Sequence, residues 1–357
     1  WGTAMLMRTT TAKILVALLI MSAVVMPMSP PLVRAQPHHV QGQVEGPVFH
    51  TLTEAYKYRV EHKDQPVVPQ GVNDPDCRAT PEHKQAVVLV HGTDTTMYAD
   101  YSQLGAAIAQ AGWCTYGFDY GAGPAPDKGF GWAPIEQSAE QLDQAVAAAR
   151  RSSGAESVVF VGFSQGATVA RYWMHSDPAH AAETHKWIGL ASPTRGGNFY
   201  GLAHLAQTFP WLHDVVGSFG LLSPALNELM TDSEFNQRLN TPAETVPGVR
   251  HVTISTRFDE MMPEGHNAAI HAGQNAEVDN IVVQDVCPDN HGGHMFMTYN
   301  PTVIDLVLSE LGAVSRDRVR CAPVPLGYSM PDVMLFDAPR KLLGGTDRPA
   351  PVDISTM

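Results

Sequence analysis

The sequence predicts an α/β fold with a mainly parallel, doubly wound sheet, and two observations support this prediction. Short apolar runs rich in valine and isoleucine alternate along the chain with segments whose apolar residues recur every three or four positions. In addition, the stretch SVVFVGFSQGATVARYW, residues 157–173, changes from an apolar run to a helical pattern within a few residues. Strands that alternate with helices in this way form parallel sheets with helices packed on both faces.

The individual strands and helices follow in order along the chain. We expect strands where β-branched and aromatic residues gather, at residues 87–90, 115–118, 158–161, 187–190, 252–254 and 281–283. We expect helices at residues 100–111 and 135–150, from residue 167 onward, and between Asn300 and Leu311. Asn300 is a favourable N-cap and Pro301 suits the first helical turn, so these two residues mark the start of the last helix.

Residues 1–35 have the pattern of a secretory signal peptide. Arg8 and Lys13 precede the apolar run 14–25, and the stretch V-R-A ends at Ala35 with small residues at the positions that define a cleavage site. A membrane anchor is the alternative, but the run is shorter than the ~20 residues that cross a bilayer. We therefore expect cleavage after Ala35, a secreted protein, and no transmembrane segment in the mature form.

The rest of the chain divides into three parts. Residues 36–65 form a polar leader without clear periodicity, and residues 66–322 form the α/β domain. Residues 323–357 form a C-terminal extension, either a surface wrap or a disordered tail, whose role the sequence does not indicate.

One segment of the domain, residues 199–230, interrupts the alternation of strands and helices. Its apolar residues recur at three and four positions, and its only formal charges are Asp214 and Glu228. Two ordinary packing helices are one interpretation. An apolar cap over the functional site is the other, because a water-soluble protein seldom exposes so many large apolar groups without a use for them.

Composition limits the partners of the chain and predicts its covalent links. The net charge is −13 over 357 residues, so we expect no nucleic-acid partner. Four cysteines in an exported chain predict two disulfides, with three possible connectivities. Proximity along the chain favours Cys77–Cys114 and Cys287–Cys321, and each closed loop stabilises the fold by about 3–4 kcal/mol.

The stretch G-F-S-Q-G predicts a nucleophile at Ser164. A strand that turns into a helix over one residue strains that residue, and the flanking Gly162 and Gly166 let the strand and the helix approach closely. The turn raises the Ser164 hydroxyl above the sheet edge, where it can attack a carbonyl carbon. A chance match is expected in roughly one chain in ten of this length, but a strand before and a helix after are the context that the motif requires.

A serine nucleophile needs a base, and the base needs a carboxylate that fixes its tautomer. In hydrolases built around this turn the order along the chain is serine, acid, histidine. Asp259 lies just past the strand at 252–254, which is where the acid is expected. Chain order does not exclude Asp232 or Asp285.

Two histidines are candidates for the base. His291 and His294 both lie in the glycine-rich loop between the last strand and the last helix. His294 is favoured because it lies nearer the apolar M-F-M that would seat its ring. An H-x-x-H pair could instead bind a metal, but no third ligand stands at a familiar spacing, so we expect neither a metal nor another cofactor.

Two backbone N–H groups are expected to stabilise the negative charge that develops on the attacked carbonyl oxygen. One belongs to Gln165, the residue after the nucleophile. The other belongs to Thr93 in the loop that follows the first strand, where Gly92 allows a close turn and the Thr93 hydroxyl can also contribute.

These stretches together resemble a known family. VVLVHGT, GWCTYGFDYG, VGFSQGATVARYW, SPTRG, TRFDEMMP and QDVCP followed by a histidine and YNP are similar to the secreted class 2 lipases of actinobacteria. Members of that family are triacylglycerol lipases and esterases with an α/β-hydrolase fold. The likeness covers about residues 70–322 and supports the two disulfides. It implies a nucleophile, an acid, a base and two oxyanion-hole residues at Ser164, Asp259, His294, Thr93 and Gln165, respectively.

Phe163 departs from the family pattern, because such lipases usually have histidine at this position. The side chain at 163 is not part of the proton relay, so the departure bears on packing or on substrate preference. The leader and the C-terminal extension lie outside the likeness.

The expected function is that of a secreted serine carboxylic ester hydrolase, a lipase that cleaves acylglycerols or related lipid esters through an acyl-enzyme. The cap would bind transiently at a lipid interface and line an acyl groove with Leu205, Phe209, Leu212 and Phe219. An acyltransferase acting on cell-envelope lipids is the alternative with the same catalytic residues, and a peptidase is compatible with the fold. An inactive surface-binding relative is the alternative of another class, disfavoured because every catalytic position is filled.

Overall fold

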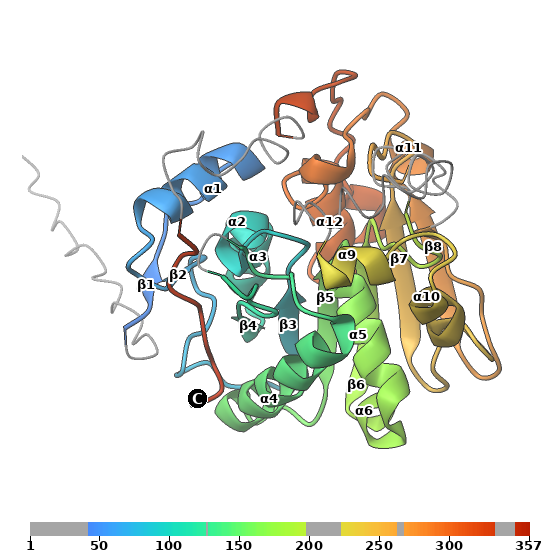
Figure 1. The fold of residues 1–357 in the computed structure, drawn as a ribbon. Coiled ribbons are helices and arrows are strands. Elements are labelled where there is room, and N and C mark those ends of the chain that lie inside the picture. Colours follow the sequence, from blue (N-terminus) through green and yellow to red (C-terminus); the bar gives the residue numbers. More distant parts are fainter. Residues whose placement is uncertain (1–41, 126–127, 198–222, 263–267, 333–346) are drawn as a thin grey trace, which may run out of the picture. The chain divides into compact units, whose positions relative to one another are not determined.

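A six-stranded parallel sheet lies at the centre of the structure, a computed structural model that describes residues 42–125, 128–197, 223–262, 268–332 and 347–357 (Figure 1). The strand order is β4-β3-β5-β6-β7-β8, and each neighbouring pair is parallel. The strands are β3 Ala86–Val90, β4 Thr115–Gly117, β5 Val158–Phe163, β6 Thr184–Leu190, β7 Arg250–Ser255 and β8 Glu277–Val282. The predicted α/β class with a mainly parallel, doubly wound sheet is confirmed.

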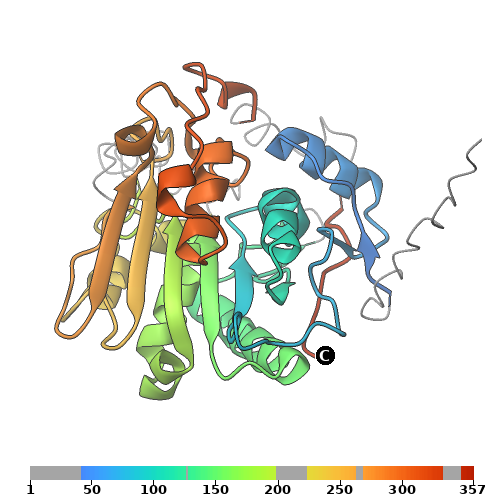
Figure 2. The same cartoon turned by 180° about the vertical axis from the view of Figure 1, so that it is seen from behind.

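Helices cover both faces of the sheet (Figures 1 and 2). On one face α4 Ile135–Ser153 and α5 Gln165–Ser176 pack against each other and against the central strands. On the opposite face lie α3 Leu104–Gln110 and α12 Pro301–Glu310. The apolar positions read from the helical spacing of α4 are all buried, because they face the sheet. The helices around the sheet are α2 Met97–Tyr101, α3 Leu104–Gln110, α4 Ile135–Ser153, α5 Gln165–Ser176, α6 Pro178–Ala182, α9 Pro224–Glu228, α10 Glu234–Leu239 and α12 Pro301–Glu310.

The strand order reverses at β3, the second strand of the sheet. The chain runs outward from β3 to β4 and then returns to β5 on the other side of β3. Loops that leave neighbouring strands at such a reversal diverge and open a site at the carboxyl edge of the sheet. Val90 pairs with Gly162 in the register of β3 and β5. Thr93 and Gln165, each three residues further on, therefore emerge side by side.

The leader has no clear periodicity in its sequence, but it contains regular structure. It contains β1 Val44–Glu45, which pairs with β2 Val67–Val68, and α1 Leu52–Glu61. Thr51 caps α1 by accepting the Glu54 N–H, and the T-x-x-E stretch at residues 51–54 is a capping signal. The buried face of α1 includes Arg59, so the spacing of apolar residues alone does not reveal it.

Two further boundaries differ from the predictions. The helix expected at 100–111 is the pair α2 and α3, and the strand expected at 281–283 is the end of β8, after which Val283 begins α11 Val283–Val286. The start of the last helix agrees with the prediction, because the Asn300 side chain accepts the Thr302 N–H at 3.1 Å.

The described end of the C-terminal extension is a surface wrap, one of the two forms expected for it. Val352 and Ile354 are buried, and Val352 exchanges two 2.9 Å hydrogen bonds with Asp119, one to its backbone and one to its carboxylate. The disulfides join the same pairs that proximity along the chain favours, Cys77–Cys114 and Cys287–Cys321.

Some predictions fall on residues that the structure does not describe. The signal sequence at 1–35 lies outside the described residues, as does most of the cap segment 199–230 with Leu205, Phe209, Leu212 and Phe219. Across the ranges that are described, no helix is both long enough and apolar enough to cross a bilayer.

Candidate active site

Ser164 occupies the turn between β5 and α5 in a strained backbone conformation. Its φ is 50° and its ψ is −121°, a region that side-chain-bearing residues rarely adopt. Contacts with two neighbouring strands, β6 and β3, keep the turn in this conformation. The Ser164 N–H donates to the Leu190 carbonyl at 2.8 Å, and a Cβ on Gly166 would lie only 2.0 Å from the Val90 carbonyl oxygen. Glycine at 166 therefore lets the start of α5 approach the end of β3 this closely.

Thr93 and Gln165 contact each other beside this turn. The Thr93 hydroxyl donates to Gln165 Oε1 at 2.6 Å. Within the described part of the chain, neither the Thr93 nor the Gln165 backbone N–H donates to a protein acceptor. Gln165 is the first residue of α5, where backbone N–H groups have no partner inside the helix and carry a partial positive charge. The two N–H groups are therefore available to a bound anionic oxygen.

Asp259 and His294 form a buried pair. Asp259 lies in the loop after β7, and its Oδ2 is 2.9 Å from His294 Nδ1. Its other oxygen, Oδ1, accepts the N–H groups of Met261 at 3.0 Å and Met262 at 2.8 Å, which fixes the carboxylate. The carboxylate in turn holds the Nδ1 side of the ring, so that Nε2 is the nitrogen available for proton transfer.

His294 lies next to the strained turn. Its ring centroid is 5.1 Å from that of Phe163, the residue before Ser164. Burial by itself lowers the pKa of His294, but the charge and hydrogen bond of Asp259, with the charges of Glu260 and Asp100, outweigh it and hold the pKa above its usual value. The imidazole is thus prepared to accept a proton.

The alternative candidates lie elsewhere. The His291 ring packs edge-on against Phe258 at 4.6 Å and not against Asp259, so the two histidines of H-x-x-H do not converge. Asp285 pairs with exposed Arg257. No group of three or more His, Cys, Asp or Glu side chains in the described ranges is arranged to hold a metal ion.

Asp100 is a buried acid at this site that the sequence analysis did not single out. Its Oδ2 accepts the Gly92 N–H at 2.7 Å and its Oδ1 accepts the Thr95 hydroxyl at 3.1 Å, so it fixes the loop that carries Thr93. Burial raises the pKa of Asp100 to about 7, against the two hydrogen bonds, which lower it. The signal in the sequence is a single charge within the otherwise uncharged run MYADY, which forms α2.

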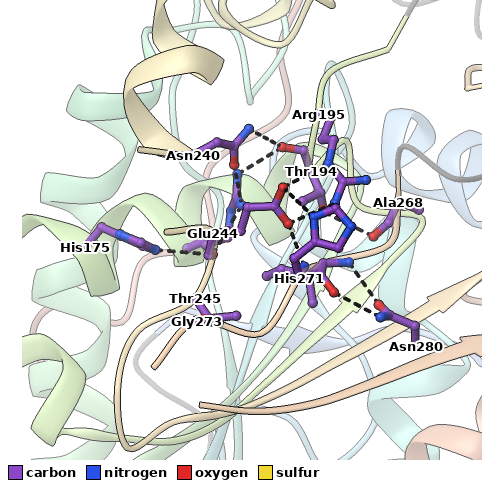
Figure 3. A network of polar contacts seen from close by, with 12 residues as sticks. His175, Thr194, Arg195, Asn240, Glu244, Thr245, Ala268, His271, Gly273 and Asn280 are labelled. Atoms are coloured by element: carbon purple, nitrogen blue, oxygen red, sulfur yellow. Dashed lines mark hydrogen bonds and ion pairs between the residues drawn. The ribbon is translucent and has the colours of Figure 1, made fainter. Parts of the chain in front are cut away.

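Thr194 and Arg195 of the S-P-T-R-G stretch, residues 192–196, belong to a polar network in the loop after β6 (Figure 3). Arg195 binds Glu244 through two 2.9 Å hydrogen bonds, and Glu244 Oε2 also accepts the His271 N–H at 2.6 Å. Buried Arg171 of α5 donates to the Thr194 carbonyl at 3.1 Å. The network fixes the loop after β6 to α5 and to the chain on either side of β7, which makes its role structural.

The comparisons with known proteins agree with this architecture. Residues 81–253, slightly less than half of the chain, match the family model described as serine aminopeptidase, S33. No curated protein matches the chain in sequence.

Solved structures also resemble the chain. Aspergillus fumigatus lipase B has a TM-score of 0.51 and 17% sequence identity, covering 77% of this chain and 68% of that one. The mature form of Bacillus licheniformis lipase BlEst2 has a TM-score of 0.45 and 15% identity, covering 66% of this chain and 94% of that one. The first likeness, together with the sheet topology, shows that the chain has an α/β-hydrolase fold. The narrower resemblance to actinobacterial class 2 lipases stays a prediction.

Proposed function

We propose that this chain, with its α/β-hydrolase fold, is a secreted serine carboxylic ester hydrolase whose nucleophile, base and acid are Ser164, His294 and Asp259. One observation above all supports the proposal. The Asp259 carboxylate contacts His294 Nδ1 at 2.9 Å, and the same imidazole packs beside Phe163, the residue that precedes the strained Ser164. Strain at a lone serine between a strand and a helix, next to a carboxylate-bound imidazole, is the arrangement that activates a hydroxyl.

The first half of the proposed reaction forms an acyl-enzyme. His294 Nε2 takes the proton of the Ser164 hydroxyl as Oγ attacks the ester carbonyl carbon. The carbonyl oxygen becomes an anion and accepts hydrogen bonds from the Thr93 and Gln165 N–H groups. When the carbon–oxygen bond to the alcohol breaks, His294 gives its proton to the departing oxygen.

The second half returns the enzyme to its starting state. A water molecule attacks the acyl carbonyl carbon while His294 Nε2 takes one of its protons. The same N–H groups hold the second anionic intermediate. Ser164 Oγ then leaves, recovers the proton from His294, and the carboxylic acid is released.

The substrate class is proposed from several weaker indications. A lipase from Aspergillus fumigatus shares the fold, which makes carboxylic esters the first class to test. The apolar segment 199–230 favours acyl chains, so we propose acylglycerols or related lipid esters as substrates and a transient contact with lipid interfaces. Two disulfides and the pattern of residues 1–35 support secretion, because disulfides persist in oxidising compartments.

The proposal is tested by labelling and by substrate profile. A fluorophosphonate probe should label the wild-type protein and not the Ser164→Ala variant, whose circular dichroism should be unchanged. Hydrolysis of p-nitrophenyl esters of increasing chain length and of a triolein emulsion should identify the acyl preference. Hydrolysis of aminoacyl p-nitroanilides tests for peptidase activity, which the name of the matched family model suggests. An added alcohol acceptor that becomes the main acylated product would favour the acyltransferase.

The cap can be tested in the same assays. Phe209→Asp and Leu212→Asp should depress hydrolysis of emulsified long-chain esters much more than hydrolysis of p-nitrophenyl acetate, because only long chains need an apolar groove. Equal losses on both substrates would identify segment 199–230 as ordinary packing.

A further inference from the structure

A second carboxylate holds the loop of the proposed base. Glu260 follows Asp259 in the chain, and its Oε2 accepts the backbone N–H of His294 at 2.6 Å. The residue before the histidine is Gly293, and a Cβ there would lie 2.0 Å from Glu260 Oε1. The carboxylate of Glu260 therefore fills the space that a side chain at 293 would occupy. Two successive acids thus hold one histidine, one by its ring and the other by its backbone.

Glu260 is itself held by the C-terminal extension. The Ser329 hydroxyl, 1% exposed, donates to Glu260 Oε1. Ser329 belongs to a segment, residues 321–332, that we call the latch. The latch starts at the disulfide Cys287–Cys321, and its Val324 carbonyl accepts the His291 N–H at 2.9 Å.

Two contacts further along the latch connect it to Phe296 and to α1. The Tyr328 ring meets the Phe296 ring edge-on at 4.8 Å, two residues after His294. At the end of the latch, Asp332 Oδ1 accepts the Thr53 backbone N–H at 3.1 Å and also accepts the Thr53 hydroxyl. The latch thus runs from the loop of the base, over Glu260, to the first turn of α1.

We propose that Glu260 is a positioning residue for His294 and that the latch, through Ser329, keeps Glu260 in place. This inference rests on the proposed function, because it assigns the base of that reaction a support outside its three catalytic residues. It also gives a role to part of the C-terminal extension, for which the sequence indicated none.

The physical reason is the sensitivity of proton transfer to position. His294 begins a short 3-10 helix, His294–Phe296, so its backbone N–H has no acceptor within that helix. A carboxylate acceptor makes a shorter and stronger hydrogen bond than a neutral one. If the acceptor is lost, the loop can relax and Nε2 can shift relative to Ser164 Oγ. A displacement of about 1 Å costs roughly 100-fold in rate.

Charge provides a readout that separates positioning from simple support of the fold. The charged groups that face the His294 ring are Asp259 and Glu260 from the loop after β7 and Asp100 from α2. Each of the three favours the imidazolium form when it is ionised, which for buried Asp100 requires a pH above about 7. Removing only the Glu260 charge should therefore lower the pKa of His294, and the acidic limb of the pH profile of kcat/KM should move to lower pH.

The experiment compares kcat, KM and pH profiles for p-nitrophenyl butyrate across variants of the full mature chain. Glu260→Ala should lower kcat by about 10–100-fold with little change in KM. Glu260→Gln should recover kcat to within about threefold of wild type, because an amide oxygen can accept the His294 N–H and the amide NH₂ can donate to Ser329. In Glu260→Gln the acidic limb should move to lower pH.

Two further variants complete the set. Ser329→Ala should lower kcat by roughly 3–10-fold, because Glu260 is then held from one side only. Glu277→Gln is the matched control. Glu277 is exposed at the first residue of β8, the end of the strand away from the carboxyl edge, and its ion pair with Arg250 has no link to His294. Its kcat and pH profile should equal those of wild type.

A measurement without turnover keeps this proposal separate from the proposed function. Hydrogen exchange followed by mass spectrometry should show faster exchange in peptides covering 287–297 for Glu260→Ala and Ser329→Ala. If the wild-type protein cleaves no ester and takes no fluorophosphonate label, the proposed function is wrong, and exchange still tests the latch. If Glu260→Ala and Ser329→Ala both match wild type in kcat and in exchange, the latch proposal is overturned.

Discussion

The Thr93 hydroxyl donates a 2.6 Å hydrogen bond to Gln165 Oε1, which joins the loop after β3 to the first residue of α5. These are the two residues whose backbone N–H groups we propose as the oxyanion hole. The side-chain bond therefore fixes the spacing of the two backbone donors before any substrate arrives. A donor set that needs no rearrangement when charge develops is the main source of electrostatic catalysis.

The first prediction concerns this bond. Thr93→Val keeps the shape of the side chain and removes the donor, so kcat for p-nitrophenyl esters should fall by about 10–100-fold with KM nearly unchanged. Thr93→Ser, which keeps the hydroxyl, should retain most of the activity. Wild-type kcat in Thr93→Val would show that the loop is held in place without this bond.

The second prediction separates the two histidines of the loop. His294→Ala should lower ester hydrolysis by about 10⁴-fold or more, because neither Ser164 nor the leaving alcohol then has a proton partner. His291→Ala should keep most of the activity, since its ring contacts Phe258 and not Asp259. Hydrolysis of p-nitrophenyl esters measures the activity of both variants. The reverse outcome would move the base to His291.

The third prediction concerns Asp259 and pH. The base must be neutral to accept a proton, so kcat/KM should fall as the pH drops through the pKa of His294, which lies above its usual value. Asp259→Asn should lower kcat by about 10⁴-fold, because the wrong tautomer is then favoured. The acidic limb of its residual activity should move to lower pH, since the charge that raised the pKa is gone. If the acidic limb stays at the wild-type pH in Asp259→Asn, the titration that produces this limb belongs to a group other than His294.

Much of this site follows from the sequence because its residues lie at the ends of strands. The sequence pattern predicts the boundary between β5 and α5, and it also predicts that Asp259 follows β7. In a parallel sheet the carboxyl ends of the strands meet at one edge, so residues far apart in sequence meet there too. The fold class and the approach of Thr93 to Gln165 could be predicted on that basis.

The parts that the sequence did not reveal depend on single polar contacts between distant segments. In the sequence Asp100 and Glu260 look like ordinary acids. Only the structure shows that their carboxylates accept the N–H groups of Gly92 and His294. The helix α1 was missed because its buried face includes a charged residue, Arg59. The Arg59 guanidinium donates to the His62 carbonyl at 3.1 Å and to the Ala350 carbonyl, a partner near the other end of the chain. Periodicity contains no information about such partners.

The last prediction concerns the buried carboxyl of Asp100 and the pH dependence of stability. Its pKa in the folded protein is about 7, raised by burial from an ordinary value of 3.8. Below pH 3.8 both the folded and the unfolded states carry the proton, and burial of the neutral acid has no ionisation cost. Between pH 3.8 and 7 the unfolded state ionises while the folded state does not. The stability of the fold therefore falls across this window and levels off above pH 7.

Asp100→Asn removes this titration and keeps the contacts. The Asn oxygen can accept the Gly92 N–H, and its NH₂ can donate to the Thr95 hydroxyl. We expect the melting temperature of Asp100→Asn to exceed that of wild type by about 5 °C at pH 8.5 and to differ little at pH 4. Differential scanning calorimetry over this pH range measures the difference directly.

Two control variants test whether the effect comes from the buried charge of Asp100. Asp285→Asn makes the same chemical change at an exposed ion pair and should alter the melting temperature little at either pH, because such pairs contribute little to stability. Asp100→Ala should melt below Asp100→Asn at every pH, because in the alanine variant the buried Gly92 N–H loses its acceptor. If Asp100→Asn instead melts below wild type at pH 8.5, burial does not raise the pKa of Asp100 in the fold. The Gly92 and Thr95 hydrogen bonds would then outweigh the cost of burying its charge.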